Sequence, residues 1–182
     1  MASNTSQEYD SVIAICKSLF LKKTNDYGTA WRILRLSSIT DQIFIKAQRI
    51  RTLEEKQVSK VADDIYSEYI GIVNYCVIAM MQMELTNEDP AELDVSLVEA
   101  LFNVHVNDTK ELMFAKNHDY GEAWRDMRIS SLTDLILMKI FRVKQIEDNQ
   151  GKTLASEGVK ANYQDMLNYA VFALIKLSLP TP

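Results

Sequence analysis

A segment of 28 residues occurs twice in this chain. Residues 23–50 and 116–143 are identical at 15 of 28 positions, at a constant spacing of 93 residues. Both copies read DYGxAWRxxRxSSxTD, and an Asn-Tyr pair follows in each, at Asn74 and at Asn168. An ungapped match of this length indicates a fused duplication, so the fold must be built from two similar units.

A short acidic segment separates the two units. Residues 86–94 read TNEDPAELD, with four acids, no base and Pro90. We interpret this segment as a linker between a first repeat (residues 1–85) and a second repeat (residues 95–182). A unit of this size is marginal alone, because small domains bury proportionally little surface. We therefore expect the repeats to pack as one domain around a pseudo-two-fold axis, and two independent bundles are the alternative.

Each repeat is expected to contain three main helices. Neither Gly nor Pro occurs between Thr29 and Ile70, which favours long helices, and no segment has a convincing strand pattern. The expected fold class is therefore all-α, a helical bundle of two tandem repeats. Apolar periodicity places the first helix at 9–22 and 95–116, the end of the second near 51 and 147, and the third at 58–85 and 156–179.

The shared motif predicts where these helices end and begin. DYG is expected to end the first helix, because Gly28 and Gly121 can adopt the positive φ found at helix C-termini. A short helix then carries AWRxxR. The serines of SSxTD are expected to act as N-caps of the next helix, and these are Ser37 or Ser38 in the first copy and Ser130 or Ser131 in the second.

The charge and the apolar content of the chain argue against some classes of binding partner. The formal net charge of −5 argues against general affinity for duplex nucleic acid or an anionic membrane. The most apolar stretch, residues 69–83, is too short to span a bilayer, and no secretory signal is apparent at the amino terminus. The expected compartment is the cytoplasm. Cys16 and Cys76 are expected to be two buried thiols.

The AWRxxR corner and the helix after it gather cations and aromatic rings. Two arginines three residues apart can hold one anion, and a Trp face offers a stacking surface for a base. The phosphate-binding candidates are Arg32, Arg35, Lys46, Arg49, Arg125, Arg128, Lys139 and Arg142. The base-contact candidates are Tyr27, Trp31, Tyr120 and Trp124. The structural alternative is a corner in which Trp fills the core, Asp and Arg pair, and lysine stems cover a helix junction.

Acids on the third helix of each copy are the candidate metal ligands. Asp64 and Glu68 share one face in the first copy, and Glu157 and Asp165 lie two turns apart in the second. Such oxygen-rich faces suit Mg²⁺, although a solvated acidic face is the alternative for the first pair. Asp165 is flanked by core residues and needs a partner or an ion.

Several cofactor classes have no matching motif. There is no HExxH or paired-His spacing, no P-loop, and no GxGxxG, GxSxG or Cys–His arrangement. No zinc, haem or dinucleotide cofactor is therefore expected. The Asn of each Asn-Tyr pair is mid-helix, and one interpretation is that it satisfies the backbone of the neighbouring copy.

The repeated DYGxAWRxxRxSSxTD segment, with its following Lys and Arg and the later Asn-Tyr, resembles the nucleotide modification associated domain 1 family, which occurs in bacteria and phages. The resemblance covers most of both copies and implies association with nucleotides. The family is similar in style to the all-α nucleoside triphosphate pyrophosphatases, whose ExxE and ExxD acids hold magnesium. At the ExxD positions the first copy has Glu68 and Gly71, and the second has Asn162 and Asp165. A complete pair would require Glu68 and Asp165 to meet across the pseudo-two-fold axis.

Three functional hypotheses follow. The first is a nucleotide-associated protein, with Mg²⁺-dependent pyrophosphohydrolysis of a nucleoside or deoxynucleoside triphosphate as its enzymatic form. The second is a non-catalytic nucleotide-sensing or protein-interaction module, and the third is a purely structural role. A nucleotide or nucleoside phosphate is the expected partner, and homo-oligomerisation stays open. The first hypothesis expects the cations and acids to line a cavity shared by both halves.

Overall fold

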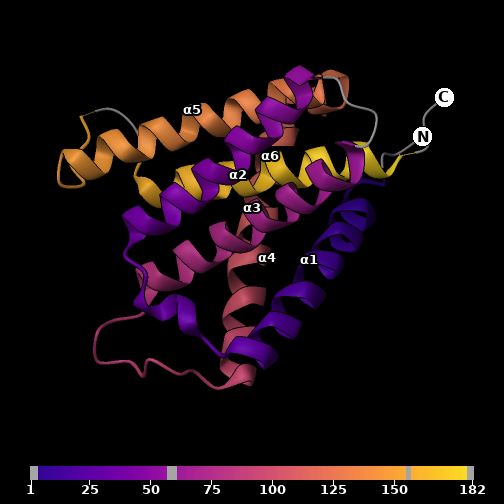
Figure 1. Cartoon of the computed structure of the whole chain (residues 1–182). Coiled ribbons are helices and arrows are strands. Elements are labelled where there is room, and N and C mark those ends of the chain that lie inside the picture. Colours follow the sequence, from indigo (N-terminus) through magenta and orange to yellow (C-terminus); the bar gives the residue numbers. More distant parts are fainter. Residues whose placement is uncertain (1–3, 57–60, 155–156, 180–182) are drawn as a thin grey trace.

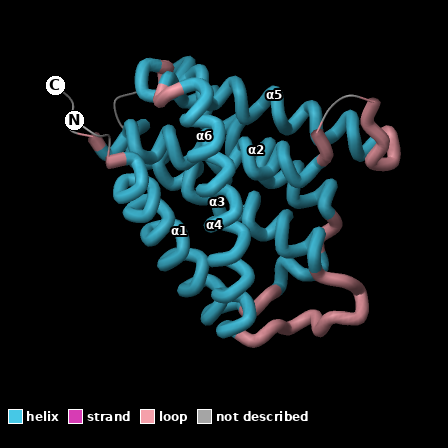
Figure 2. The backbone as a smooth tube through the Cα atoms, turned by 180° about the vertical axis from the view of Figure 1, so that it is seen from behind, coloured by secondary structure: helices cyan, strands magenta, loops and turns pink. Residues whose placement is uncertain are grey.

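The computed structural model describes residues 4–56, 61–154 and 157–179, with side chains described from Ile65 onward in the second range. These residues form helices, turns and loops and no strand (Figures 1 and 2), so the all-α prediction is confirmed. The helices are α1 (Thr5–Tyr27), η1 (Ala30–Ile33), α2 (Leu36–Lys56), α3 (Val61–Glu84), α4 (Val95–Tyr120), η2 (Ala123–Asp126), α5 (Ile129–Asp148) and α6 (Val159–Ser178), where η marks a short 3-10 helix.

The two repeats share one hydrophobic core. Helices α2, α3, α6 and α5 form a four-helix bundle in which each helix packs against the next and α5 packs against α2, and α1 and α4 descend from it (Figure 1). Buried apolar residues from all six α-helices belong to a single packed cluster, and they include Val12, Ile43, Ile72, Phe102, Ile136 and Leu174. Each repeat therefore covers the apolar face that the other would leave in water.

Two matching hydrogen-bonded triads join the repeats. The Tyr163 hydroxyl lies 2.6 Å from Thr40 Oγ1, which lies 3.3 Å from Glu147 Oε1. At the equivalent positions, the Tyr69 hydroxyl lies 2.5 Å from Thr133 Oγ1, which donates to Glu54 Oε1 at 2.7 Å. Every member of one triad is the repeat counterpart of a member of the other. This reciprocity is what a two-fold relation between the copies produces.

Glycine ends the first helix of each repeat as predicted. Gly28 and Gly121 both have φ of 64°, with ψ of −147° and −158°. The helices run longer than expected, to Tyr27 and Tyr120, so DYG is the last turn and its exit. The AWRxxR segment then forms a 3-10 helix in each copy.

The predicted serine N-caps are wrong. Helix α2 begins at Leu36 and α5 at Ile129, so all four serines lie inside the first turn. The N-cap of α5 is Arg128, whose backbone is extended and whose carbonyl accepts from Ser131 N at 3.0 Å. In α2 the Arg35 carbonyl accepts from Ser38 N in the same way. These are the ordinary first hydrogen bonds of a helix, and no side chain caps the start of α5.

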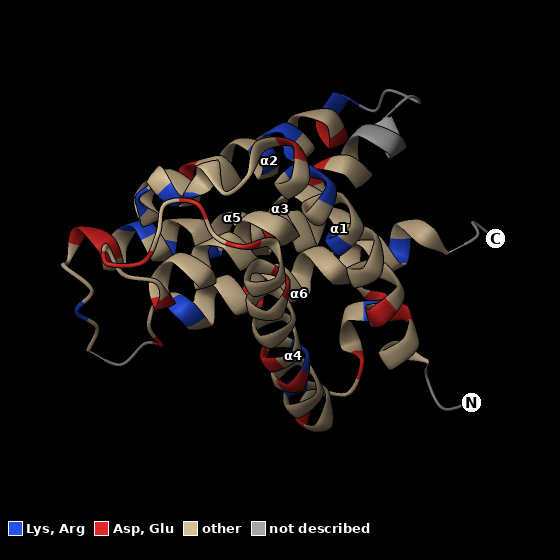
Figure 3. Ribbon diagram, turned by 90° about the horizontal axis from the view of Figure 1, so that it is seen from below, with Lys and Arg blue, Asp and Glu red and all other residues tan. Residues whose placement is uncertain are grey.

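The acidic linker is fastened to the first corner. Between α3 and α4 the chain is non-helical, and Figure 3 shows its acids as red segments of a loop. Thr29 Oγ1 donates to Ala91 O at 2.8 Å and accepts from Leu93 N at 3.0 Å, while Thr29 N donates to Glu92 Oε1 at 3.2 Å. Thr29 is 1% exposed, so this attachment is partly buried and restrains the linker.

The cysteines and the apolarity of the helices were also subjects of the sequence predictions. Both cysteines are buried free thiols, as predicted, and burial raises the pKa of Cys16 to about 12. Among the helices within the described part of the chain, none is long and apolar enough to cross a membrane.

The triads predict a pH-dependent difference in stability. Burial raises the pKa of Glu54 and of Glu147 above the ordinary 4.5, against the opposing hydrogen bonds from Thr133 and Thr40. A raised folded-state pKa means that the favourable contribution is present below pH 4.5 and is lost as the pH rises. The double variant E54Q/E147Q keeps the acceptor oxygens and has no charge to desolvate. We expect its thermal midpoint to exceed that of the wild type at pH 7, by on the order of a few degrees.

The same difference should vanish near pH 4, where the wild-type carboxyls are protonated. Thermal unfolding of both proteins between pH 4 and pH 8 measures it, and other titrating groups cancel because both proteins contain them. A difference that is independent of pH would contradict the account.

The paired glycines offer a matched test of the linker contact. Alanine at Gly28 or Gly121 meets the same backbone strain, about 1–3 kcal/mol for this region of φ and ψ. A Cβ at Gly28 would also clash with the Glu92 carboxylate, whereas a Cβ at Gly121 meets nothing within 4 Å. We expect urea unfolding to show that G28A is the more destabilised variant. Equal losses in G28A and G121A would mean that Glu92 moves away without cost.

Candidate functional site

The corner arginines hold the fold together. Arg32 donates from Nε to Pro90 O at 3.3 Å, from one terminal nitrogen to Thr86 O at 2.9 Å, and from the other to the Gln82 side chain. Gln82 in turn donates to Arg32 O at 3.0 Å. Arg32 therefore ties η1 to the end of α3 and to the linker. Its role is structural, but its partners are backbone carbonyls and Gln82, not the Asp that the structural alternative expected.

Arg125, the repeat counterpart, is engaged in a different way. Its guanidinium contacts Glu8 at 2.5 Å, Glu122 at 3.0 Å and Thr5 Oγ1 at 2.7 Å. The hydrogen bond to Glu8 is the largest cause that raises the pKa of Arg125. The guanidinium carbon also lies 4.4 Å from the centroid of the Trp124 ring. This corner is thus fastened to the start of α1.

The two corners lie at opposite ends of α1. Helix α1 has 23 residues, about 35 Å at 1.5 Å per residue. The first corner follows its C-terminus, and the second contacts its N-terminal residues. The remaining corner candidates, Arg35, Arg128, Tyr27 and Tyr120, are exposed. The corners therefore do not face each other, in contrast to the expected shared cavity.

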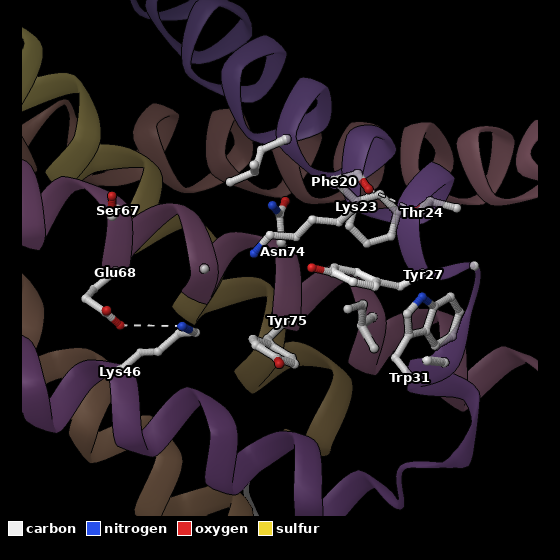
Figure 4. Close-up of a pocket in the computed structure, with 15 residues that line it drawn as sticks. Phe20, Lys23, Thr24, Tyr27, Trp31, Lys46, Ser67, Glu68, Asn74 and Tyr75 are labelled. Atoms are coloured by element: carbon white, nitrogen blue, oxygen red, sulfur yellow. Dashed lines mark hydrogen bonds and ion pairs between the residues drawn. The ribbon is translucent and has the colours of Figure 1, made fainter.

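A pocket lies inside the first repeat, between α1, η1, α2 and α3 (Figure 4). We name it the first-repeat pocket; its volume is about 510 Å³. Figure 4 shows Lys23 of α1 and Lys46 of α2 extending toward α3 from two sides, with the Tyr27 and Trp31 rings at the opposite end. The residues that line it include Lys23, Tyr27, Trp31, Lys46, Glu68, Gly71, Asn74, Tyr75 and Ile78.

The charges in this pocket are unevenly paired. Glu68 lies 2.6 Å from Arg49 and 3.5 Å from Lys46, so Arg49 holds it more closely. The Lys46 ammonium also lies 5.8 Å from the centroid of the Tyr75 ring. Lys23 has no ion-pair or hydrogen-bond partner among the residues that the structure describes. One cation of the pocket is therefore unpaired and a second is weakly paired.

Two polar atoms at the pocket also lack partners. Asn74 Nδ2 donates to Cys16 O at 3.1 Å, which orients Oδ1 away from that carbonyl. Asn74 is 8% exposed, and its Oδ1 has no hydrogen-bond partner within the described chain; the same holds for Trp31 Nε1. The sequence interpretation that Asn satisfies the backbone of the neighbouring copy is wrong, because the carbonyls that Asn74 and Asn168 bind, those of Cys16 and Thr109, each belong to the same repeat as the Asn. A buried acceptor without a donor is costly unless something fills the place.

The equivalent place in the second repeat is filled by an acid. Asp165 lies 2.5 Å from Lys116 and 2.8 Å from Lys139, and it is 4% exposed. Burial alone would lower the pKa of Lys116, but the hydrogen bond and charge of Asp165, with Glu157, raise it. Lys116 and Lys139 are the counterparts of Lys23 and Lys46, and Asp165 is the counterpart of Gly71.

The candidate metal ligands do not come together. Glu68 and Asp165 are each bound by cations of their own repeat, Glu157 is exposed, and the Asp64 side chain lies outside the described residues. Across the described part of the chain, no group of three or more His, Cys, Asp or Glu residues could hold a metal ion. A divalent cation at Glu68 or Asp165 would sit beside two positive groups, so these donors do not suit magnesium.

A larger and more open cavity of about 1110 Å³ lies on the second repeat, along α5. Lys139, Arg142 and Glu157 line it together with Arg51. Lys139 is already held by Asp165, and Arg51 lies beside Glu55 and Asp134. Arg142 and Lys152 have no hydrogen-bond or ion-pair partner among the described residues, but they lie in a cavity that is more open to solvent than the first-repeat pocket.

Sequence reasoning missed Lys23 as a site residue. Its signal was present, because Lys23 and Lys116 are identical at the first position of the repeated segment. What was lacking was the packing of α1 beside α3, which places this exposed lysine at a pocket. Lys46 and Trp31, by contrast, were candidates, and both line the pocket.

Comparison with known proteins agrees with the duplication. The family profile described as nucleotide modification associated domain 1 matches residues 23–83 and, a second time, residues 116–177. Searches of curated proteins and of solved structures found no match. The two matched segments contain the corner, the lysines and the Asn-Tyr pair of each repeat and together cover more than half of the chain. The chain therefore belongs to the nucleotide modification associated domain 1 family, of which it carries two tandem copies.

Proposed function

We propose that this protein binds a nucleoside phosphate in the first-repeat pocket. The observation that carries the proposal is the pair Lys23 and Lys46, which reach one pocket from different helices with no acid between them. A phosphate placed there gains two cations at once, in a pocket whose walls exclude part of the solvent.

Glu68 sets the strength of this interaction. A bound phosphate competes with Glu68 for Lys46, but that ion pair is long at 3.5 Å. Arg49 holds Glu68 at 2.6 Å and keeps it on the α2 side. Lys46 can therefore turn to the ligand without leaving an uncompensated carboxylate.

The other end of the pocket suits a base and sugar. Trp31 and Tyr27 supply flat faces, and Tyr27 stands at the rim with 73% of its surface exposed. Base stacking on such rings contributes about 1–3 kcal/mol per base. The Asn74 oxygen accepts a hydrogen bond from a ribose hydroxyl or a base amine, and Trp31 Nε1 donates one to a ring nitrogen or carbonyl.

Binding and hydrolysis require different things of Glu68. The magnesium-dependent pyrophosphohydrolase hypothesis needs several carboxylates around a metal. Among the described residues that line the first-repeat pocket, Glu68 is the sole carboxylate. This donor set favours a nucleotide-binding or nucleotide-sensing role over hydrolysis.

Two neighbouring lysines provide a matched test of binding. Lys22 and Lys23 are both exposed on α1, and of the two only Lys23 lines the pocket. With a panel of ribonucleoside and deoxyribonucleoside mono- and triphosphates, we expect K23A to lower affinity by about five- to tenfold. K22A should bind as the wild type does. Isothermal titration calorimetry measures both, and equal affinities in K22A and K23A would place the ligand elsewhere.

A Glu68 variant separates the two roles. If Glu68 competes for Lys46, E68Q should bind the nucleotide at least as tightly as the wild type. If Glu68 holds a catalytic magnesium ion, E68Q should abolish release of phosphate or pyrophosphate from triphosphates incubated with Mg²⁺ or Mn²⁺. Turnover by the wild type that E68Q removes would support the hydrolase and contradict simple binding.

A further inference from the structure

We infer that the two repeats have diverged into one open site and one site that is closed by its own side chains. The side chains that close the site of the second repeat therefore mark where the groups of a ligand lie in the first repeat. This inference rests on the proposed nucleotide binding. Asp165 stands where the ligand's anionic group lies, and Phe172 stands where its flat ring lies. The chain therefore takes one nucleoside phosphate, not two.

The anion position follows from the lysine pairs. In the second repeat both ammonium groups converge on Asp165, which is buried between α4, α5 and α6. In the first repeat the lysines are retained, but the residue at the same register of α3 is Gly71. A carboxylate and a phosphate oxygen make the same charge-assisted bonds to an ammonium group. The missing carboxylate is thus replaced by an anion from outside.

The two repeats differ in where this acid lies on the third helix, and not in whether the acid is present. The first repeat has its acid three residues earlier, at Glu68, where the second has Asn162. Glu68 binds Arg49 and Lys46 on the α2 side, and the lysine from α1 is left without an acid. The acid has therefore moved one helical turn away from the point where the two lysines converge.

The ring position follows from the tryptophans. Trp124 stacks on Phe172, with ring centroids 4.3 Å apart and planes 5° apart, and Trp124 is 5% exposed. The counterpart of Phe172 is Ile78, which lines the first-repeat pocket beside Trp31. Trp31 is only half-buried. A flat ring of the ligand supplies the stacking that Phe172 supplies in the second repeat.

A third difference between the two repeats concerns a hydrogen-bond donor to the Asn of the Asn-Tyr pair. Asn168 Oδ1 accepts a hydrogen bond from the Tyr9 hydroxyl at 2.8 Å. The repeat counterpart of Tyr9 is Phe102, which has no hydroxyl, and Asn74 Oδ1 is left buried without a donor. The first-repeat pocket thus lacks an anion, a ring and a donor. At the equivalent place in the second repeat, Asp165 and Phe172 of that repeat supply the anion and the ring, and Tyr9 of the first repeat supplies the donor.

These three groups define the ligand class. Asp165 and Phe172 are seven residues apart on α6, about 10 Å along the helix axis. A ligand that matches must carry an anionic group at one end, a flat ring at the other and a hydrogen-bond donor between them. A nucleoside phosphate has this order of groups, with the ribose hydroxyls between base and phosphate.

The first arm of the test closes the open site. In G71D a carboxylate enters between Lys23 and Lys46; the Cβ meets the Lys46 side chain at 2.7 Å, which is a flexible contact that can give way. Titration calorimetry of the full chain with the tightest-binding member of the nucleotide panel should give one site per wild-type chain. G71D should lose affinity by about tenfold or more, and I78F should also weaken binding. The control G158D adds the same charge at the N-cap of α6, where a Cβ meets nothing within 4 Å.

The second arm opens the closed site and uses inorganic phosphate as the probe. In D165G the cations Lys116 and Lys139 lose their acid, so the thermal midpoint should fall. Millimolar phosphate should raise that midpoint more than it raises the midpoint of the wild type, with chloride at matched ionic strength as the reference.

The outcomes separate the inference from the proposed function. Absence of nucleotide binding by the wild type overturns both. Binding by the wild type with two sites, or binding by G71D equal to that of G158D, overturns the inference alone. Circular dichroism confirms that G71D is folded, and a phosphate response of D165G no larger than that of the wild type also counts against the inference.

Discussion

The burial of each repeat against the other is the constraint on which this structure depends. Neither repeat encloses its own apolar residues, and one core runs through both. At the contact between them, the hydroxyls of Tyr69 and Tyr163 cross to the opposite repeat and bind Thr133 and Thr40. Both tyrosines are fully buried, so the hydrogen bonds must form whenever the core does. Packing and polar pairing therefore select the same two-fold arrangement.

Because the core is shared, the residues that join the two repeats are different from the residues that line the pocket. The pocket residues of each repeat lie away from the triads, at the places where α1 meets α3 and α4 meets α6. The second repeat places Asp165 there and gains a buried ion pair on two lysines. The first repeat leaves the same lysine positions without a central acid. Duplication thus permits one copy to pair its two lysines with an acid of its own while the other remains available to a ligand.

The fold could be predicted from the sequence because its signals are local. Helix periodicity and the glycine of DYG act within a few residues, and the positive φ of both glycines is confirmed. The serine N-caps were wrong because the helices begin before the serines, at Leu36 and Ile129, and no side chain caps the start of α5. Arg32 and Arg125 were candidates for phosphate by their spacing, but tertiary contacts with the linker and with α1 occupy them. The roles of Lys23 and Gly71 could not be predicted in this way, because they depend on which helices contact each other. A local sequence pattern does not contain that information.

The central claim is that one repeat takes a ligand at the place where the other keeps its own acid. A crystal structure of the chain grown with a saturating nucleoside phosphate tests it most directly. The account predicts phosphate density beside Gly71, within hydrogen-bonding reach of the Lys23 and Lys46 ammonium groups, a base against Trp31, and an Asp165 still bound by its two lysines. A nucleotide bound at the second repeat, or at both repeats alike, would contradict it.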